Sequence, residues 1–353
     1  MHNIRKIGIR ILLILAALFL YQRGVEYLYR PHNETITFIN KERREYDGEI
    51  ETIICGTSTA QRGIDPEIID KKMETVSFNT ASSLQPLDGT YELIKDVTRN
   101  NPVETVILGI ASDIMMKREV DTKYKSRLYD RLQSPVSKFK YQLRGCTVDE
   151  WPYMMFYSAR VEDYFAGESI RENINVKQSE EYKAGQIIES NYKAKGMIAN
   201  KKKLKGEQPD VLTQGESEFS ADKVKAHNLE SLVEIAEYCS DNQIELILVY
   251  IPLPGKKIQS YGDITTIHDY FTEFAKKHDA LFWDFNYHKE LKTLFTNDKF
   301  EDTKHLNRNG AEVFSEQLAD MYYRYHTGEN IEEDFLDTCP YYVASESVGE
   351  KDE

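Results

Sequence analysis

Short apolar runs alternate with longer amphipathic segments along most of the chain. The runs are rich in Val, Ile, Leu and aromatic residues and are bounded by turn residues or helical patterns, which is typical of buried parallel strands. They cover residues 51–56, 75–78, 105–110, 244–251 and 280–285. Helical spacing of apolar residues is found over residues 91–98, 223–238 and 264–278, and again from about Asn309. This order predicts an α/β fold with a mostly parallel sheet, helices on both faces, and a ligand site at the carboxyl ends of the strands.

The alternation breaks between the third and fourth predicted strands. Residues 115–221 are rich in Tyr, Lys, Glu and Met and contain no clear strand run. We therefore expect an insertion, or lid, over the edge of the sheet where the ligand site lies. Its lysines gather in one cluster, which consists of Lys193, Lys195, Lys201, Lys202, Lys203 and Lys205. Such a cluster is most often a solvated loop, and the alternative is a docking site for an anionic polymer or for lipid headgroups.

The first 30 residues are predicted to form a membrane anchor. Arg5, Lys6 and Arg10 precede an apolar run over residues 11–21, which becomes longer if Arg10 snorkels to the interface. No small-x-small cleavage site follows, so an uncleaved transmembrane helix is favoured over a removed signal peptide, with a buried N-terminal helix as the alternative. The basic residues ahead of the run place the N-terminus in the cytoplasm and the rest of the chain outside the cell membrane.

The remaining chain divides around the insertion. Residues 31–48 are expected to form a polar tether after the anchor. The main domain is predicted to comprise residues 49–114 and 222–327. Residues 328–353 are acidic, and we expect them to form a disordered tail.

Charge and cysteine content exclude several classes of function. The formal net charge is −14 and the isoelectric point is near 5.2, which argues against nucleic acid as a partner. The four cysteines show no C-x-x-C spacing, so neither a zinc site nor a dense disulfide framework is predicted. We expect Cys55 and Cys239 to be buried thiols, while one disulfide that involves Cys146 or Cys339 stays open.

Two motifs at opposite ends of the main domain carry the candidate chemistry. Ser58 follows the first predicted strand directly, where backbone N–H groups can face an oxyanion, and the alternative is an ordinary helix N-cap. His305 lies just ahead of the last predicted helix and is the only histidine with an Asp, Asp302, three residues before it. A serine hydroxyl becomes a nucleophile when an imidazole takes its proton, and a carboxylate fixes the tautomer of that imidazole. Ser58, His305 and Asp302 together predict acyl chemistry at a serine, with no metal or organic cofactor.

The combination resembles the SGNH, or GDSL-like, hydrolase superfamily, whose members place the serine in a Gly-x-Ser turn after the first strand and an Asp-x-x-His motif before the final helix. The tripeptide Gly56-Thr57-Ser58 and the segment from Asp302 to His305 match these two blocks. The resemblance spans roughly residues 50–325. It implies a three-layer, flavodoxin-like α/β/α sandwich with a five-stranded parallel sheet, in which Ser58 is the nucleophile, His305 the base and Asp302 the residue that orients His305.

The two middle blocks depart from the family pattern. The second block supplies an oxyanion-hole N–H from a glycine, and here Ser83, or alternatively Ser82, stands in that place. The third block presents an asparagine side chain, for which Ser112 would substitute with a shorter reach. The resemblance thus assigns the oxyanion hole to Ser58, Ser83 and Ser112. It also implies supporting or substrate-contacting positions for Gly56, Thr59, Asn79, Asp113 and Asn307.

Within the superfamily the chain is similar to membrane-tethered, exported members that act on cell-envelope polymers, such as the D-alanyl transfer protein of teichoic acids and alginate-type O-acetyltransferases. The likeness rests on the predicted anchor, the run from Gly56 to Pro66 and the Asp-x-x-His-Leu-Asn ending. It implies transfer of an O-acyl group, commonly acetyl, to or from an envelope or exported polysaccharide through an acyl-Ser58 intermediate, with a multi-spanning membrane acyltransferase as partner. The alternatives are a simple carbohydrate or lipid esterase, and a non-catalytic envelope scaffold that keeps the fold.

Overall fold

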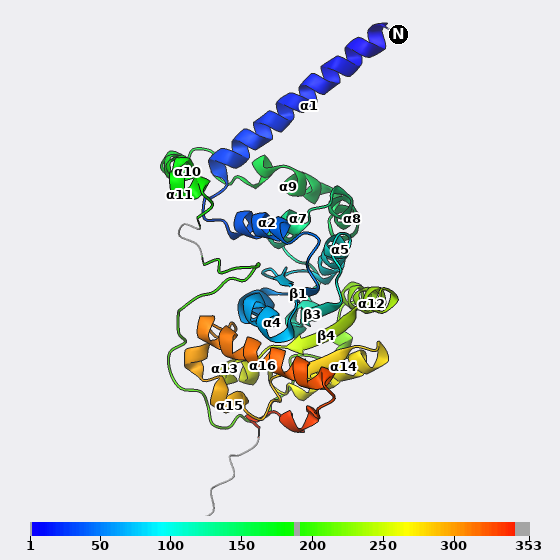
Figure 1. Ribbon diagram of the computed structural model, residues 1–353, viewed down its shortest axis with the longest axis vertical. Coiled ribbons are helices and arrows are strands. Elements are labelled where there is room, and N and C mark those ends of the chain that lie inside the picture. The colour runs from blue at the N-terminus through cyan, green and yellow to red at the C-terminus, as the bar shows by residue number, and fades with distance from the viewer. Residues whose placement is uncertain (1, 187–190, 343–353) are drawn as a thin grey trace, which may run out of the picture.

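A parallel sheet of five strands forms the centre of the computed structural model, which describes residues 2–186 and 191–342 (Figure 1). The strand order is β2-β1-β3-β4-β5. The strands are β1 (Thr52–Gly56), β2 (Ser77–Asn79), β3 (Thr105–Gly109), β4 (Glu245–Tyr250) and β5 (Leu281–Asp284). Every predicted strand is therefore present, with its ends within two residues of the expected positions.

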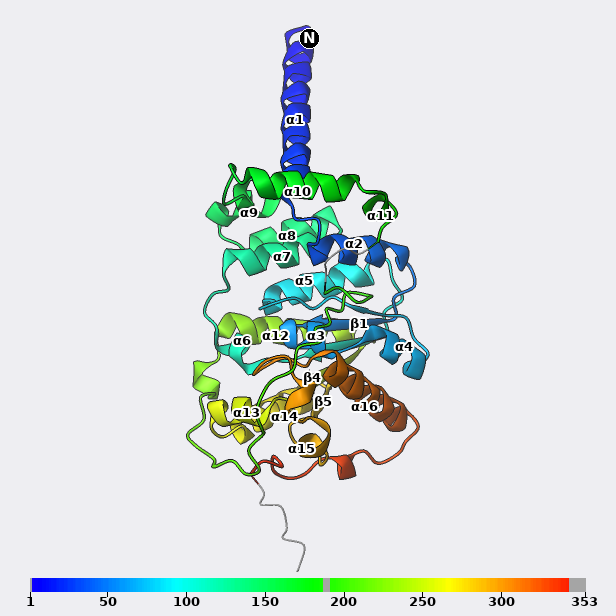
Figure 2. The same cartoon turned by 90° about the vertical axis from the view of Figure 1, so that its left-hand side faces the viewer.

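Helices cover both faces of this sheet. One face is covered by α3 (Ser58–Gly63), α4 (Pro66–Met73) and α16 (Arg308–His326) (Figures 1 and 2); α3 contacts β1, α4 contacts β2, and α16 packs on both helices. On the other face lie α5 (Leu87–Thr98), α12 (Ala226–Asp241) and α14 (Thr265–Lys277), which contact β1, β4 and β5 respectively. The short helices α6 (Ser112–Met116), α13 (Gly255–Tyr261) and α15 (Leu291–Leu294) complete the domain. Because both faces are covered, β1 and β3 are buried over their whole length, and the predicted α/β fold is confirmed.

A further layer of helices is stacked on the outer side of α5 (Figure 2). It consists of α2 (Thr35–Glu45), α7 (Thr122–Arg131), α8 (Pro135–Gly145), α9 (Trp151–Met155), α10 (Gly167–Gln178) and α11 (Glu180–Lys183). Leu93 of α5 is fully buried against Leu128, Leu132 and Tyr141 of this layer. The first part of the insertion therefore covers an apolar face of α5, whereas we expected the whole insertion over the edge of the sheet.

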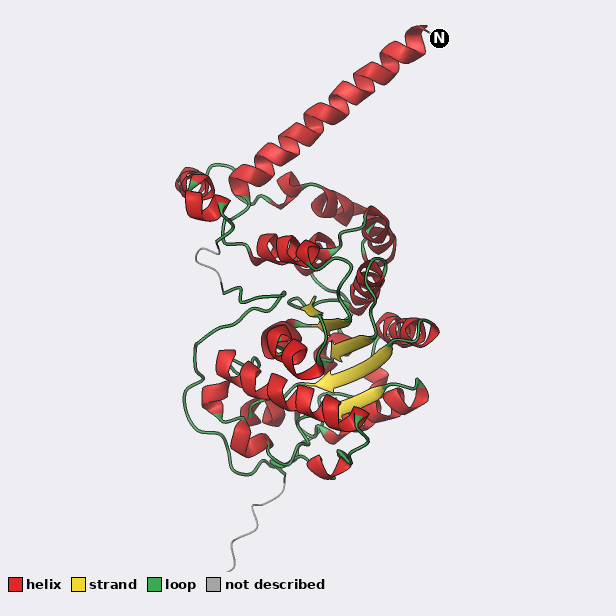
Figure 3. Cartoon of the chain, viewed as in Figure 1, coloured by secondary structure: helices red, strands yellow, loops and turns green. Residues whose placement is uncertain are grey.

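The second part of the insertion does run along the carboxyl edge of the sheet. This segment, residues 191–221, has little regular structure (Figure 3). Its backbone is tied to the main domain by hydrogen bonds from Ile198 N to Gln61 O (3.2 Å) and from Leu204 N to Phe300 O (2.8 Å). It therefore passes close to both of the sequence motifs that carry the candidate chemistry.

The N-terminal helix α1 (His2–Tyr29) projects away from the rest of the molecule (Figure 1). Within the described ranges, no helix combines the length and the apolar character that crossing a membrane requires, so the predicted transmembrane anchor is not supported. Charged residues interrupt the apolar run of this helix at Arg10 and again at Arg23. The alternative of a buried N-terminal helix is wrong, because the apolar side chains from Ile4 to Tyr21 are largely exposed.

The segments expected to be a tether and a disordered tail contain ordered structure. Helix α2 lies within residues 31–48 and buries Ile36 and Ile39. In the C-terminal segment, Tyr341 is buried and its carbonyl accepts a hydrogen bond from Leu212 N at 2.7 Å. Residues 343–353 of the predicted tail lie outside the described residues. All four cysteines are free thiols, so the alternative of a disulfide is not realised.

Candidate active site

The first motif lies at the carboxyl end of β1, where the chain turns sharply into α3. Gly56 has φ +128°, and a Cβ at this position would lie 2.3 Å from the carbonyl oxygen of Gly109. A Cβ on Gly109 would in turn lie 2.6 Å from Cβ of Ala60 in α3. The two glycines, which are paired in register on β1 and β3, therefore allow α3 to begin directly above the sheet edge. Ser58 is the first residue of that helix.

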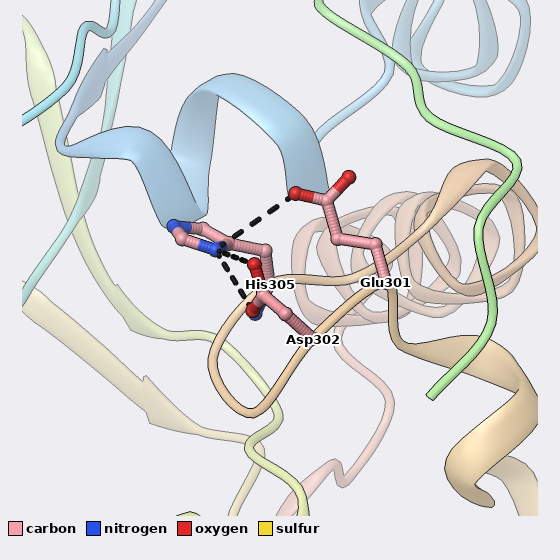
Figure 4. Close-up of side chains that lie close together, drawn as sticks. All are labelled: Glu301, Asp302 and His305. Carbon is pink, nitrogen blue, oxygen red and sulfur yellow. Dashed lines mark hydrogen bonds and ion pairs between the residues drawn. The ribbon is translucent and has the colours of Figure 1, made fainter. Parts of the chain in front are cut away.

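The Ser58 hydroxyl lies 2.8 Å from Nε2 of His305. On the other side of the ring, Nδ1 of His305 lies 3.0 and 2.9 Å from the two carboxylate oxygens of Asp302. Figure 4 shows Asp302 and His305 pointing toward each other from one loop. The N-cap of α3 is Thr57, so the hydroxyl of Ser58 is not used as the expected alternative of a helix cap. The structure thus brings together the three residues that the sequence predicted as a unit.

The geometry of the His305 loop is fixed by backbone hydrogen bonds. Asp302 Oδ1 accepts from the backbone N–H of His305 (2.9 Å) and of Lys304 (2.8 Å). Glu301 N donates to the carbonyl of His305 at 2.9 Å, which closes the turn. Immediately after the loop, Asn307 caps α16 by accepting from Gly310 N at 3.1 Å. The carboxylate and the imidazole are therefore held by the turn itself.

Burial and neighbouring charges set the protonation of this pair. Burial lowers the pKa of His305 below its usual 6.5, the hydrogen bond with Asp302 opposes this, and the positive charge of Arg62 lowers it further. Burial alone would raise the pKa of Asp302, but the hydrogen bonds from His305 and from the Lys304 backbone outweigh it and keep that pKa low. At neutral pH the pair is thus a neutral imidazole beside a carboxylate, the state that a general base needs.

The loop after β2 contains two backbone N–H groups, those of Ser83 and Leu84, that make no hydrogen bond with the described residues. Ser82 N donates to the carbonyl of Gly56 at 3.2 Å, so the Ser82 N–H is already used. The N–H of Ser83 makes no hydrogen bond within the described parts of the chain, and Ser83 is partly exposed. Of the two serines that the sequence left open, Ser83 is the one whose N–H is available to an oxyanion.

Ser112 is not presented to the surface beside Ser58. Its side chain is fully buried, and its hydroxyl lies 3.4 Å from the hydroxyl of Tyr250 on β4. The next residue, Asp113, accepts hydrogen bonds from Tyr261 (2.8 Å) and from the ammonium of Lys304 (2.8 Å). Helix α6 is therefore joined to the His305 loop by the ion pair of Asp113 and Lys304.

The remaining predicted support residues have structural contacts. Asn79 donates from its amide to the carbonyls of Ala60 (2.9 Å) and Ile64 (3.0 Å), which fixes α3 to the end of β2. The hydroxyl of Thr59 pairs with that of Thr57 at 3.1 Å. The amide of Asn307 donates to the carbonyl of Lys202 at 3.0 Å, and so joins residues 191–221 to the His305 loop.

Two charged residues at the site were missed by the sequence analysis. Arg62 lies four residues after Ser58 on α3, and its guanidinium forms an ion pair with the carboxylate of Glu301. Glu301 is almost completely buried, and one of its oxygens lies 3.9 Å from Nδ1 of His305 (Figure 4). The available signals were the one-turn spacing of Arg62 from Ser58 and the acidic residue directly before Asp302.

Glu301, Asp302 and His305 also place three potential metal-ligand atoms within 4.8 Å of one another. The carboxylate of Glu301, however, already pairs with Arg62, and both nitrogens of His305 are engaged by Asp302 and Ser58. These residues fit an acid-base site better than a cation site, and we assign no metal to them.

The predicted lysine cluster separates into two parts. Lys193 forms ion pairs with Asp65 and Glu67, and Lys195 forms one with Asp70. The other four lysines are exposed, namely Lys201, Lys202, Lys203 and Lys205. This second part lies next to the His305 loop, because Arg308 N donates to the carbonyl of Asn200 at 2.7 Å.

The chain matches no known protein-family profile and no curated protein sequence. The resemblance to the SGNH superfamily therefore rests on the two sequence motifs alone.

Proposed function

We propose that the chain is a serine-dependent O-acyl transferase or esterase of the SGNH type. The observation that carries the proposal is the continuous arrangement of Ser58 Oγ, the His305 ring and the Asp302 carboxylate, with contacts of 2.8 and 2.9 Å. A hydroxyl, an imidazole and a carboxylate in this order form the arrangement that activates a serine as a nucleophile. The site also lies at the carboxyl edge of the parallel sheet, where α/β proteins bind their ligands.

In the first half of the reaction, Ser58 Oγ attacks the carbonyl carbon of an acyl ester while His305 Nε2 takes the hydroxyl proton. The carbonyl oxygen becomes an oxyanion, which accepts hydrogen bonds from the N–H groups of Ser58 and Ser83. Asp302 accepts from Nδ1 and stabilises the imidazolium. The ester bond then breaks, His305 returns its proton to the leaving alkoxide, and the acyl group remains on Ser58.

In the second half, a hydroxyl group or a water molecule attacks the acyl-serine. His305 removes the proton of the attacking hydroxyl, and the same N–H groups bind the second oxyanion. Collapse of this intermediate breaks the bond to Ser58, whose oxygen regains a proton from His305. With a sugar hydroxyl as acceptor the net reaction is acyl transfer, and with water it is hydrolysis.

The proposed acyl group is acetyl and the proposed acceptor or donor is an envelope or exported polysaccharide. This part rests on the resemblance alone, as does the expected membrane acyltransferase partner. The proposed location outside the cell membrane rests on the sequence alone, through the basic residues ahead of the N-terminal apolar run.

A non-catalytic scaffold with the same fold is the second candidate. It is favoured by the position of Ser112, since a hydroxyl that faces Tyr250 cannot replace an asparagine donor without moving. Loss of one oxyanion donor costs a rate factor of about 100 or more. The aligned Ser58 and His305 favour the enzyme, because a scaffold does not require a free hydroxyl within hydrogen-bond distance of a neutral imidazole.

The proposal is tested with p-nitrophenyl acetate. We expect the full chain to release nitrophenolate and to form an acetyl adduct on Ser58, and an added oligosaccharide to receive the acetyl group if transfer is the reaction. Ser58→Ala removes the nucleophile and should abolish both release and adduct, whereas Ser240→Ala changes an exposed serine at the end of α12 and should leave them unchanged. Equal turnover by the Ser58→Ala variant would refute the proposal.

A further inference from the structure

The ion pair of Arg62 and Glu301 joins the two elements that carry the proposed nucleophile and base. Arg62 lies on α3, four residues after Ser58, so the two side chains extend from the same side of the helix. Glu301 lies on the His305 loop, four residues before His305. The contact between Ser58 and His305 depends on how α3 sits against that loop, and the pair spans this junction.

The ion pair is also buried enough for its charges to influence the protonation of His305. Only 4% of the Glu301 side chain and 28% of the Arg62 side chain is exposed, compared with 48% for Asp302. Glu301 Oε2 and Arg62 Nε are buried and make no hydrogen bond with the described residues. Charges in such surroundings are weakly screened, and removal of one partner leaves the other uncompensated.

We propose that Arg62 and Glu301 are positioning residues, which together hold α3 on the His305 loop and balance the charge that reaches the imidazole. Within this pair the guanidinium favours a neutral His305, while the carboxylate, 3.9 Å from Nδ1, favours the imidazolium. The carboxylate of Glu301 offsets part of the guanidinium charge, and the hydrogen bond with Asp302 is then the main interaction that stabilises the imidazolium during the reaction.

The other charged groups around His305 are few. Arg62 faces it from α3, beside the neutral hydroxyl of Ser58, and Asp302 and Lys304 flank it on its own loop. The ammonium of Lys304 is in turn paired with Asp113 of α6. A substitution at Glu301 leaves Asp302, Lys304 and Asp113 unchanged but removes the ion-pair partner of Arg62, so each single variant is compared with the double variant, which lacks both charges.

This inference rests on the proposed function for its catalytic meaning, but its test does not need turnover. The ring of His305 is titrated by NMR in the full chain labelled with ¹⁵N-histidine, and its signals are assigned with His305→Gln. In parallel, the rate of labelling by a fluorophosphonate probe is measured against pH. The variants are Arg62→Met, Glu301→Gln and the double variant.

The two single variants should move the titration of His305 in opposite directions. Arg62→Met removes a cation and frees the carboxylate of Glu301, so the titration should move upward by about half a pH unit or more, and Glu301→Gln should move it downward. The double variant should return close to the wild-type titration but label about tenfold more slowly, because the junction of α3 and the loop is weakened.

A matched control is available elsewhere in the molecule. Arg144 and Glu234 form an ion pair between α8 and α12, and the side chain of Arg144 is as exposed as that of Arg62. Arg144→Met should leave both the titration and the labelling rate unchanged. Shifts in the same direction for Arg62→Met and Glu301→Gln, or no shift in either folded variant, would overturn the inference. Absence of labelling in wild type with opposite titration shifts would instead count against the proposed function alone.

Discussion

Two Asp-His pairs lie at the carboxyl edge of the same sheet, and they differ in what the imidazole faces. Asp302 and His305 are joined at 2.9 Å and lead on to the hydroxyl of Ser58. Asp284, at the end of β5, contacts Nδ1 of His268 at 3.0 Å, but that ring stacks on Tyr287 with centroids 4.0 Å apart. Its Nε2 makes no hydrogen bond within the described ranges. The second pair therefore resembles the first in its Asp-His contact and lacks the nucleophile.

The carboxylates of the two pairs are also embedded differently. Asp284 is only 1% exposed and accepts hydrogen bonds from the backbone and the side-chain amide of Asn286, at 2.9 and 3.1 Å. Asp302 is held by the N–H groups of its own turn and remains half exposed. We infer that the Asp284 pair fastens α14 to the sheet, whereas the Asp302 pair serves the chemistry.

The largest expected effect separates the two histidines. His305→Ala should lower the rate of fluorophosphonate labelling by about 10³-fold or more, because the base is lost. The His268→Ala variant should be labelled at a rate within about threefold of wild type. It should unfold at a lower temperature, because the buried carboxylate of Asp284 loses its imidazole partner. Labelling rates and thermal unfolding of both variants check this. Equal losses of labelling in the two variants would show that the Asp302–His305 pair has no role in labelling that the Asp284–His268 pair lacks.

Amide substitutions in the two carboxylates give the next largest effect. Asp302→Asn should lower the labelling rate by about 10² to 10⁴-fold with little change in stability, because the amide fails to fix the tautomer of His305. Asp284→Asn should destabilise the fold by about 1–3 kcal/mol, since it leaves buried groups poorly paired. Urea unfolding beside labelling measures both quantities, and a stability loss confined to Asp302→Asn would contradict the assignment.

The pH dependence of labelling should follow His305 alone. Labelling needs the neutral imidazole, and burial lowers the pKa of His305 below 6.5, so the rate should hold its plateau through neutral pH and fall only in more acidic solution. The profile of His268→Ala should superimpose on that of wild type. A decline that begins at or above pH 7 would show that His305 is not the base.

A smaller effect is expected at the predicted oxyanion hole. Ser112→Ala should label within about threefold of wild type, because its hydroxyl faces Tyr250 instead of the surface near Ser58. A rate loss of about 100-fold would show that Ser112 turns toward the oxyanion during reaction and would restore the role that the family resemblance implies.

The smallest effect is expected at the exposed lysines. Neutralising Lys201, Lys202 and Lys203 should not change labelling by a neutral probe, and as a solvated loop they should not change the affinity for an anionic polymer. Binding assays in low and high salt check this. A salt-dependent loss of affinity would instead favour the docking surface.

The sequence alone predicts the features of the fold and of the site that depend on neighbouring residues in the chain. Each strand is a short apolar run whose ends can be read from the residue types. Ser58 directly follows β1 and begins α3, and Asp302 lies on the loop just before α16. The contact between Ser58 and His305 joins residues 247 positions apart, and it could be predicted because both motifs lie at strand ends or helix starts that a parallel sheet brings to one edge.

The sequence alone does not predict the features that depend on contacts between distant parts of the chain. The helices of the insertion form around the apolar outer face of α5, and the buried pair of Arg43 and Asp96 (2.6 Å) that fastens α2 to it has no local pattern. Arg62 and Glu301 each look like ordinary surface residues, and only their contact places them at the site. The N-terminal apolar run is a local signal as well, but it does not reveal whether the exposed helix that it forms lies in a membrane.

The central claim is that Ser58 is a nucleophile activated by His305, and the most direct measurement is to locate the fluorophosphonate adduct by peptide mass spectrometry. The account predicts one adduct, on the peptide that contains Ser58, in the folded wild-type chain and none in the His305→Ala variant or in denatured protein. An adduct on a different residue, or equal modification of Ser58 in the His305→Ala variant, would contradict it.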